Sequence, residues 1–450
     1  MMNLIETVKD AGIVGAGGAG FPTHVKISAK AQVFIINAAE CEPLIETDKY
    51  LMRTFPNEIL EAAQIVAEHL GAEHKVIALK SKYQKEIQAL QKAINETSSS
   101  FKLVMMNSFY PAGDEQTLVQ LVTGRSVPER GLPLDVGAVV SNVGTMLNVY
   151  QALKGNPVTD KYLSVVGEVA QPIMLHVPLG TTLQECINQA GPTLAEYDII
   201  VGGPMMGKVY RGNNIQGLTV TKTTGNILVL PKNHYLVKCA ELPLPSIIAQ
   251  TKSACVQCKM CTDMCPRYLI GHKIRPNMVM RNMYREKLIV DDSEYEVAFG
   301  DAANCCDCGV CEMFACPMGL SPRKVNSYVK GQLAGRGLKP ASNKAPVALE
   351  ELLYRRIPTE RLVARLDLMN YFNAHADDCV SIEPECVSIL MKQHIGVSGD
   401  VCVTVGDKVQ KGDLMVKAKE GALSANVHAS IKGRITSVDG ERIVINKEKE

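Results

Sequence analysis

Two dense runs of cysteine restrict this chain more than any other feature. Nine of its fifteen cysteines lie between Cys255 and Cys316. The first run has the spacing C-x2-C-x2-C-x3-C-P and ends at Cys265; the second begins at Cys305 with the spacing C-x2-C-x2-C-x4-C-P. Three thiolates separated by two residues can wrap one corner of an iron–sulfur cubane, and the fourth cysteine can ligate another cluster. The runs therefore predict two [4Fe–4S] clusters.

The last cysteine of each run is expected to serve the other run's cluster, as in ferredoxins that hold two clusters. One ligand set is then Cys255, Cys258, Cys261 and Cys316, and the other is Cys265, Cys305, Cys308 and Cys311. Cys306 breaks the spacing and is interpreted as a spare thiol, with replacement of Cys305 as the alternative. Structural zinc is the alternative for the runs, but zinc takes four ligands in paired units and has no use for the third cysteine.

The overall composition excludes several classes of partner. With Lys+Arg 48 against Asp+Glu 47, the net charge of +1 creates no field that favours nucleic acid or an anionic membrane. No run of about 18 apolar residues is present, and the N-terminus lacks a basic stretch before an apolar one. We expect a cytoplasmic protein without a membrane span, in which metal rather than disulfides occupies the clustered cysteines.

The pattern along the chain predicts a multidomain fold, because 450 residues exceed what one hydrophobic core usually serves. Apolar runs such as 33–36 alternate with helical patterns such as 57–70, which predicts an α/β domain with a mainly parallel sheet. The expected units are an α/β domain at 1–155, a β-grasp module at 156–240, an α-helical, ferredoxin-like two-cluster domain at 241–335, a helical linker at 336–390 and an all-β domain at 391–450. An interface segment is the alternative for the linker.

A glycine-rich loop opens the α/β domain, with glycines at 15, 17, 18 and 20 followed by Phe21 and Lys26. Glycines let the backbone approach a phosphate, and free N–H groups and a lysine can balance its charge. A plain turn is the alternative. Two further stretches follow in order, Asn37–Pro43 and then Tyr110–Glu115 with Ser141–Thr145. Together these three segments resemble the NADH-binding flavoprotein subunit of respiratory complex I and the C subunit of Rnf ferredoxin–NAD oxidoreductases.

This resemblance implies a binding site for FMN and NADH in the α/β domain. It implies that FMN is held by Gly15, Gly17, Gly18, Gly20, Lys26, Asn37, Asn142 and Thr145. The carboxylates of Glu40, Glu42, Asp114 and Glu115 would line the flavin and nicotinamide side. Within that group, Glu40, Asp114 and Glu115 would form the catalytic set by orienting ribose or amide groups, and Phe21 would stack on the dinucleotide.

The middle and the end of the chain resemble two further modules. Residues 158–235, with Gly202-Gly203-Pro204, resemble the soluble-ligand-binding β-grasp (SLBB) module, for which a structural spacer is the alternative. The tail resembles the barrel-sandwich hybrid fold of biotinyl and lipoyl domains. The modified lysine of such a carrier would fall near Ala422, so we expect a docking or packing piece rather than a swinging arm.

The order of these parts, together with the second cysteine run and Gln393–Gly396, resembles the cobalamin reductases of propanediol-utilisation microcompartments. The resemblance implies FMN, two [4Fe–4S] clusters, NADH as donor and cobalamin as acceptor. It also implies a corrinoid adenosyltransferase and microcompartment shell proteins as partners, and a location within a bacterial microcompartment.

Electron counting agrees with this set of cofactors, because NADH delivers two electrons as a hydride whereas a cubane or a corrin cobalt accepts one. One alternative is an Rnf-like electron-transfer protein that couples NADH to ferredoxin or another redox enzyme. The other is a non-catalytic docking protein of the microcompartment.

Overall fold

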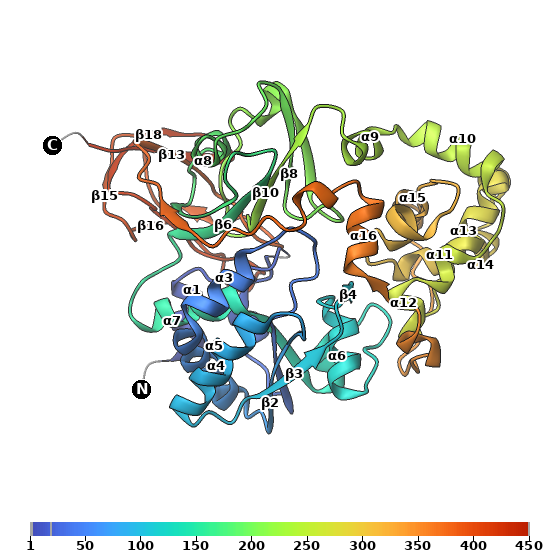
Figure 1. The fold of residues 1–450 in the computed structure, drawn as a ribbon, viewed down its shortest axis with the longest axis horizontal. Helices are drawn as coiled ribbons and strands as arrows, with labels where there is room; N and C mark the ends of the chain where they lie inside the picture. Colours follow the sequence, from blue (N-terminus) through green and yellow to red (C-terminus); the bar gives the residue numbers. More distant parts are fainter. Residues whose placement is uncertain (1–2, 19, 449–450) are drawn as a thin grey trace.

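A parallel four-stranded sheet forms the centre of the N-terminal module in the computed structural model, which describes residues 3–18 and 20–448 (Figure 1). Its strand order is β3-β2-β1-β5, with β1 at Val33–Asn37, β2 at His74–Lys80, β3 at Lys102–Met106 and β5 at Ala138–Asn142. Successive side chains of β1 point to opposite faces. Phe34 and Ile36 join the core on one face, and Val33 and Ile35 join the core on the other.

Helices cover both faces of this sheet. Its helices are α1 (Leu4–Asp10), α2 (Thr23–Lys26), α3 (Thr47–Thr54), α4 (Pro56–Leu70), α5 (Gln84–Thr97), α6 (Glu115–Thr123) and α7 (Val143–Leu153). Helices α4 and α7 pack against each other in the larger core, whereas α6 packs in the smaller one. Strand β1 lies between β2 and β5, so the strand order reverses there and a crevice is expected outside the carboxyl ends of β1 and β5.

The β-grasp module is a six-stranded sheet around helix α8 (Leu183–Ala190), which begins with a capping box between Thr182 and Glu185. Its order is β12-β7-β6-β10-β8-β9, with β6 at Asp160–Gly167, β7 at Ile173–Pro178, β8 at Tyr197–Val201, β9 at Lys208–Arg211, β10 at Asn226–Pro231 and β12 at Cys379–Ser381. The edge strand β12 comes from much later in the chain and pairs in parallel with β7.

Short helices surround the cysteine runs in the next module, on the right of Figure 1. They are α9 (Tyr235–Glu241), α10 (Leu244–Ala254), α11 (Met260–Asp263), α12 (Pro266–Leu269), α13 (Pro276–Asn282), α14 (Asp292–Phe299) and α15 (Pro322–Gly335). Helices α10, α13 and α15 contact one another and enclose the module's own apolar core.

The segment 336–390, expected to be a helical linker, differs from that expectation. Its one α-helix among the described residues is α16 (Thr359–Arg365), beside two short 3-10 turns. Strand β11 (Ile357–Pro358) pairs with β4 (Phe109–Tyr110) of the α/β module, and β12 joins the β-grasp sheet. Apolar side chains such as Leu362 and Leu368 are buried against several modules at once. The segment is therefore an interface piece, because its apolar residues meet partners that lie far away in sequence.

Two small antiparallel sheets form the C-terminal module around an apolar core of their own. One contains β13 (Cys386–Leu390), β19 (Arg442–Asn446), β18 (Gly433–Val438) and β15 (Lys408–Val409); the other contains β14 (Asp400–Val401), β16 (Leu414–Lys417) and β17 (Val427–His428). The buried Lys222 of the β-grasp module donates hydrogen bonds to the carbonyls of Gly12 and Asn426, both at 2.6 Å. This lysine joins three modules. Within the described ranges, no helix combines the length and apolar character needed to cross a membrane.

Candidate functional site

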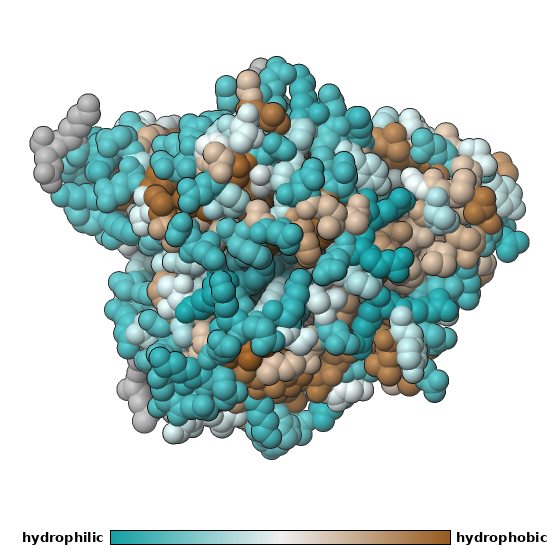
Figure 2. Space-filling view, viewed as in Figure 1, coloured by the Kyte–Doolittle hydropathy of each residue, from teal (hydrophilic) through white to brown (hydrophobic). Residues whose placement is uncertain are grey.

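A cavity of about 1200 Å³ lies at the crevice outside the carboxyl ends of β1 and β5. Asn37 ends β1 and Asn142 ends β5, and both side chains line it. The β-grasp module, the cysteine module and the C-terminal module complete the wall, for example through Thr221, Cys308 and Lys411. Figure 2 shows a hollow near the middle of one face, bordered by hydrophilic residues. The volume exceeds the roughly 300–1,000 Å³ of ordinary small-molecule pockets, so the cavity has room for a cofactor and a second ligand.

Seven of the thirteen residues predicted for the flavin and nicotinamide site line this cavity: Gly17, Gly18, Asn37, Glu40, Glu42, Asp114 and Asn142. Hydrogen bonds hold the two asparagines in place. The Asn37 amide donates to the carbonyl of Gly113 at 2.9 Å. Asn142 caps α7 by accepting from the Gly144 N–H at 2.8 Å, and its amide donates to Asp48 at 2.6 Å. The ends of both strands therefore present fixed polar groups to the cavity.

Six predicted residues lie outside the lining: Gly15, Gly20, Phe21, Lys26, Glu115 and Thr145. Three of them shape the glycine-rich loop, because the Gly15 N–H donates to the Phe21 carbonyl at 2.9 Å and the Thr145 hydroxyl accepts from the Ala16 N–H at 3.0 Å. The Lys26 ammonium instead pairs with Glu115 at 2.7 Å and donates to the Val140 carbonyl at 2.9 Å. The structure thus gives no support to a phosphate contact by Lys26 or to stacking by Phe21.

Buried carboxyl groups dominate the side of the cavity that follows β1. Burial raises the pKa of Glu42 to about 7, and burial followed by the neighbouring Asp48 and Glu42 charges raises the pKa of Glu40. Glu42 accepts a hydrogen bond from the Met205 N–H at 2.9 Å, whereas its Oε1 is buried without a partner among the described residues. A buried acceptor of this kind is costly unless a donor reaches it. The unpartnered oxygen fits a ligand that carries N–H or O–H groups.

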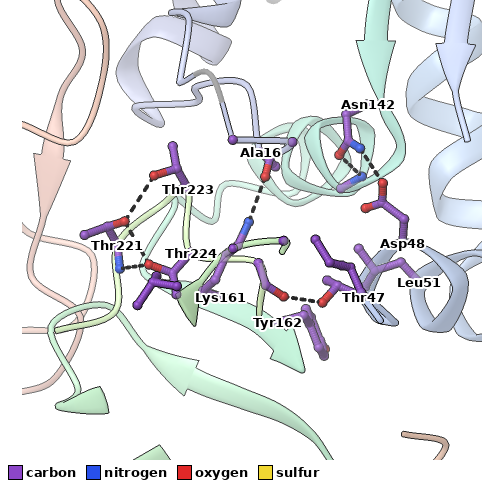
Figure 3. Close-up of a pocket in the computed structure, with 18 of the residues that line it drawn as sticks. Ala16, Thr47, Asp48, Leu51, Asn142, Lys161, Tyr162, Thr221, Thr223 and Thr224 are labelled. Atoms are coloured by element: carbon purple, nitrogen blue, oxygen red, sulfur yellow. Dashed lines mark hydrogen bonds between the residues drawn. The ribbon is translucent and has the colours of Figure 1, made fainter. Parts of the chain in front are cut away.

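Three further parts of the cavity lining were not predicted from the sequence (Figure 3). They are Asp48, Lys161 and the threonines of the loop Thr221–Thr224. Lys161 did carry a signal. Leu163 and Val165 of β6 are buried in the apolar core, and position 161 lies on the same side of the strand, so a lysine there needs a reason. The threonines carried no signal in the sequence, because no short motif identifies hydroxyl groups that reach a cavity from another module.

The two cysteine runs adopt the same backbone conformation. Gln257 and Lys259, on either side of Cys258, both have positive φ, at 56° and 68°. Asp307 and Gly309, on either side of Cys308, repeat this with φ of 57° and 79°. Non-glycine residues rarely adopt this conformation, and such strain is typical of ligand-binding loops. The match places Cys305 in the position of Cys255 and Cys306 in the position of Val256, which favours Cys306 as the spare thiol.

Both predicted ligand sets come together. Cys265, Cys305, Cys308 and Cys311 line one small cavity, although Cys265 belongs to the first run. In the other set, burial and then the neighbouring thiols of Cys255, Cys316 and Cys258 raise the pKa of Cys261 to about 12. In the part of the chain that is described, no three His, Cys, Asp or Glu side chains converge on a point that suits a single metal ion. The thiols of the set with Cys265 border a small cavity, as ligands of a larger cluster would. Backbone N–H groups also reach sulfur, from Asp307 to Cys305 at 3.5 Å and from Leu320 to Cys316 at 3.4 Å.

The large cavity and the small cysteine cavity share a wall. Cys306 and Cys308 line both of them, and the buried Tyr110 hydroxyl donates to the Cys308 carbonyl at 2.7 Å. Near this wall, Arg267 binds both carboxylate oxygens of Asp114, with Nη2 at 2.8 Å from Oδ1. The Asp114 carboxylate therefore joins the α/β module to the cysteine module and has little capacity left for orienting a ribose.

Four family models match the chain in the expected order. The Nuo51 FMN-binding domain matches residues 8–151, and the SLBB domain matches residues 162–209. The 4Fe-4S dicluster domain matches residues 254–321, and the RnfC barrel sandwich hybrid domain matches residues 378–450. These matches confirm the predicted fold class and the predicted FMN and [4Fe–4S] cofactors. The domain limits and the individual ligand residues stay predictions.

Two curated relatives cover nearly the whole chain. The cobalamin reductase PduS of Citrobacter freundii is 37% identical over 98% of this chain and 95% of its own length. The chain belongs to the PduS family. The PduS of Salmonella typhimurium is 38% identical over the same shares of both chains.

More distant relatives match only part of the chain. The C subunit of the proton-translocating ferredoxin:NAD(+) oxidoreductase complex of Clostridium ljungdahlii is 33% identical over 63% of this chain and 60% of its own length. Among solved structures, an NAD+-reducing [NiFe]-hydrogenase in the H2-reduced state is similar with a TM-score of 0.51 and 21% identity. That match covers 75% of this chain and 62% of the hydrogenase chain. At this level of identity the similarity concerns the fold alone.

Proposed function

We propose that this chain is an NADH-dependent cobalamin reductase that uses FMN and two [4Fe–4S] clusters and supports the regeneration of adenosylcobalamin. The wall formed by Cys306 and Cys308 carries the proposal, because it brings the predicted flavin cavity next to a predicted cluster site. The name of the two PduS relatives, cobalamin reductase, indicates the acceptor.

The residues define an inner and an outer end of the redox chain. When bound, FMN accepts the two electrons of a hydride and releases them one at a time, so that it connects NADH to one-electron acceptors. Glu40 and Glu42 are half-buried carboxyl groups of the cavity wall that can form hydrogen bonds with polar groups of the ligands. At the inner end, Cys308 is buried beside the cavity, and at the outer end Cys258 is exposed. The ligand set that contains Cys258 is therefore the accessible one for a large acceptor.

The test is an anaerobic titration with NADH followed by hydroxocobalamin, monitored by absorption spectroscopy. Intact protein should reduce the corrin. A Cys308→Ala variant should still reduce a two-electron dye with NADH but lose most of its cobalamin reduction, because the inner cluster lacks a ligand. A Cys402→Ala variant is the matched control, since Cys402 is an exposed thiol of the C-terminal module far from both runs in sequence.

Two results would contradict the proposal. Corrin reduction that survives in Cys308→Ala would mean that the flavin site serves the corrin directly. Rapid reduction of a ferredoxin by intact protein that leaves hydroxocobalamin oxidised would favour an electron-transfer role, as the similarity to the ferredoxin:NAD(+) oxidoreductase of Clostridium ljungdahlii suggests.

We further propose a corrinoid adenosyltransferase and microcompartment shell proteins as partners, within a bacterial microcompartment. The support is the resemblance of the whole chain together with exposed apolar side chains on the cysteine module. Tyr284, Leu288 and Val297 are 65%, 77% and 84% exposed, and Figure 2 shows hydrophobic residues on the right of this face, where that module lies. Apolar surface of this kind favours contact with another protein.

A further inference from the structure

A buried lysine of the β-grasp module points toward the glycine-rich loop (Figure 3). Lys161 lies on β6, is 8% exposed and lines the cavity. Its ammonium donates to the Ala16 carbonyl, with Nζ at 3.3 Å from the oxygen. Lysine is rarely buried unless an anion pairs with it. The position of Lys161 therefore needs an explanation that packing does not provide.

The charge of Lys161 is incompletely balanced by the protein. An ammonium group has three donors, and one carbonyl at 3.3 Å satisfies only one of them. Burial lowers the pKa of Lys161 to about 8, against the opposite influence of Asp48. The Asp48 carboxylate itself accepts a hydrogen bond from Asn142. An anionic ligand in the cavity would complete the surroundings of the lysine.

The features around Lys161 suit a phosphate. Helix α7, eleven residues long, begins at Val143 beside the cavity, and the N-terminus of a helix attracts anions. Gly17 and Gly18 of the loop line the cavity, and Gly17 lies next to Asn142, whose side-chain amide would be 3.4 Å from a Cβ at position 17. Thr223 and Thr224 add hydroxyl groups from the β-grasp module (Figure 3).

We propose that Lys161 is the cation that balances the phosphate of FMN. The β-grasp module is then part of the flavin site rather than a spacer. Lys26, the lysine of the glycine-rich loop, is already engaged by Glu115 and Val140 and lies outside the lining. The inference rests on the flavin part of the proposed function and is independent of the acceptor.

Riboflavin provides the test, because it has the isoalloxazine and ribityl groups of FMN but no phosphate. The full chain is freed of flavin and titrated with either compound, and binding is followed by the quenching of flavin fluorescence. Lys161→Gln should weaken FMN about tenfold to a hundredfold, as expected for the loss of a hydrogen-bonded charge, and leave riboflavin unchanged. Lys161→Arg should keep most of the preference for FMN, and Lys26→Gln should keep all of it.

Equal weakening of FMN and riboflavin in Lys161→Gln would overturn the proposal, because it would show a purely structural role. Loss of the preference for FMN in Lys26→Gln, with its retention in Lys161→Gln, would place the phosphate at Lys26 instead. Lys161→Met, which keeps the volume without the charge, is the second variant if the glutamine disturbs folding, and the same two outcomes apply to it. Iron content reports whether the cysteine module is intact. Corrin reduction is not part of the readout, so failure of the proposed acceptor would leave this result unaffected.

Discussion

Replacing Cys265 with alanine should remove about half of the iron, from the cluster site of the second run rather than that of its own run. Cys265 lines the small cavity together with Cys305, Cys308 and Cys311, so its loss leaves that site with three of its four predicted ligands. The other site keeps all four of its predicted ligands. Iron and acid-labile sulfide in protein purified without oxygen measure the loss, and the electron paramagnetic resonance of the reduced protein shows which cluster signal remains.

Cys306→Ala is the matched control for this experiment, because Cys306 lines the same small cavity one residue away from Cys305. The shared backbone of the two runs places Cys306 opposite Val256, which has no thiol, so the variant should keep all of its iron. Loss of iron from Cys306→Ala together with full iron in Cys305→Ala would show that the second run ligates in a different register. Full iron in Cys265→Ala would contradict the exchange of ligands between the runs.

The spacing of each cysteine run predicts a curved loop, because this geometry is local. Three thiols separated by two residues can meet one cluster only through a tightly curved loop, and both runs form that loop with positive φ around the middle cysteine. The exchange of the fourth ligand follows from the same pattern. The polar ends of β1 and β5 were also predictable, because the carboxyl ends of neighbouring parallel strands meet at one edge.

The rest of the flavin site depends on contacts between distant parts of the chain. Lys161 reaches Ala16 across 145 positions of sequence, and Lys26 meets Glu115 across 89. No local pattern shows which of the two lysines would bind a phosphate. The glycine-rich loop favoured Lys26 because it is nearer in sequence. The segment 336–390 shows the same limit, because the pairing of Ile357 with Tyr110 is set by tertiary packing rather than by any period in the sequence.

Breaking the ion pair between Asp114 and Arg267 should have the second large effect, which is a loss of stability. Both groups are largely buried, and the pair joins the α/β module to the cysteine module through two hydrogen bonds. Asp114→Asn leaves the Arg267 charge buried without its partner. Removing one member of a buried ion pair costs about 3–5 kcal/mol, so the free energy of unfolding in denaturant under nitrogen should fall by that amount.

The dependence on pH separates this pair from a simple packing defect. Burial raises the pKa of Asp114, but the Arg267 guanidinium and the hydrogen bonds outweigh burial and hold the pKa below its ordinary value. An unfolded aspartate has a pKa of about 3.9. Stabilisation by the pair is therefore fully present above that pH and is lost only as the pH falls through the lower pKa of the folded state. The difference between wild type and Asp114→Asn should stay constant from about pH 6 to 8, because Asp114 is ionised in both states there.

A double variant, Asp114→Asn with Arg267→Gln, completes a double-mutant cycle. It removes the unpaired charge that the single variant leaves behind, so it should be more stable than Asp114→Asn alone. A double variant that is less stable than the single one would mean that Arg267 stabilises the protein through contacts other than Asp114. A stability difference that grows between pH 6 and 8 would mean that another titrating group, rather than the Asp114 carboxylate, responds to the substitution. Either outcome would contradict the proposal that this ion pair links the flavin cavity to the cysteine module.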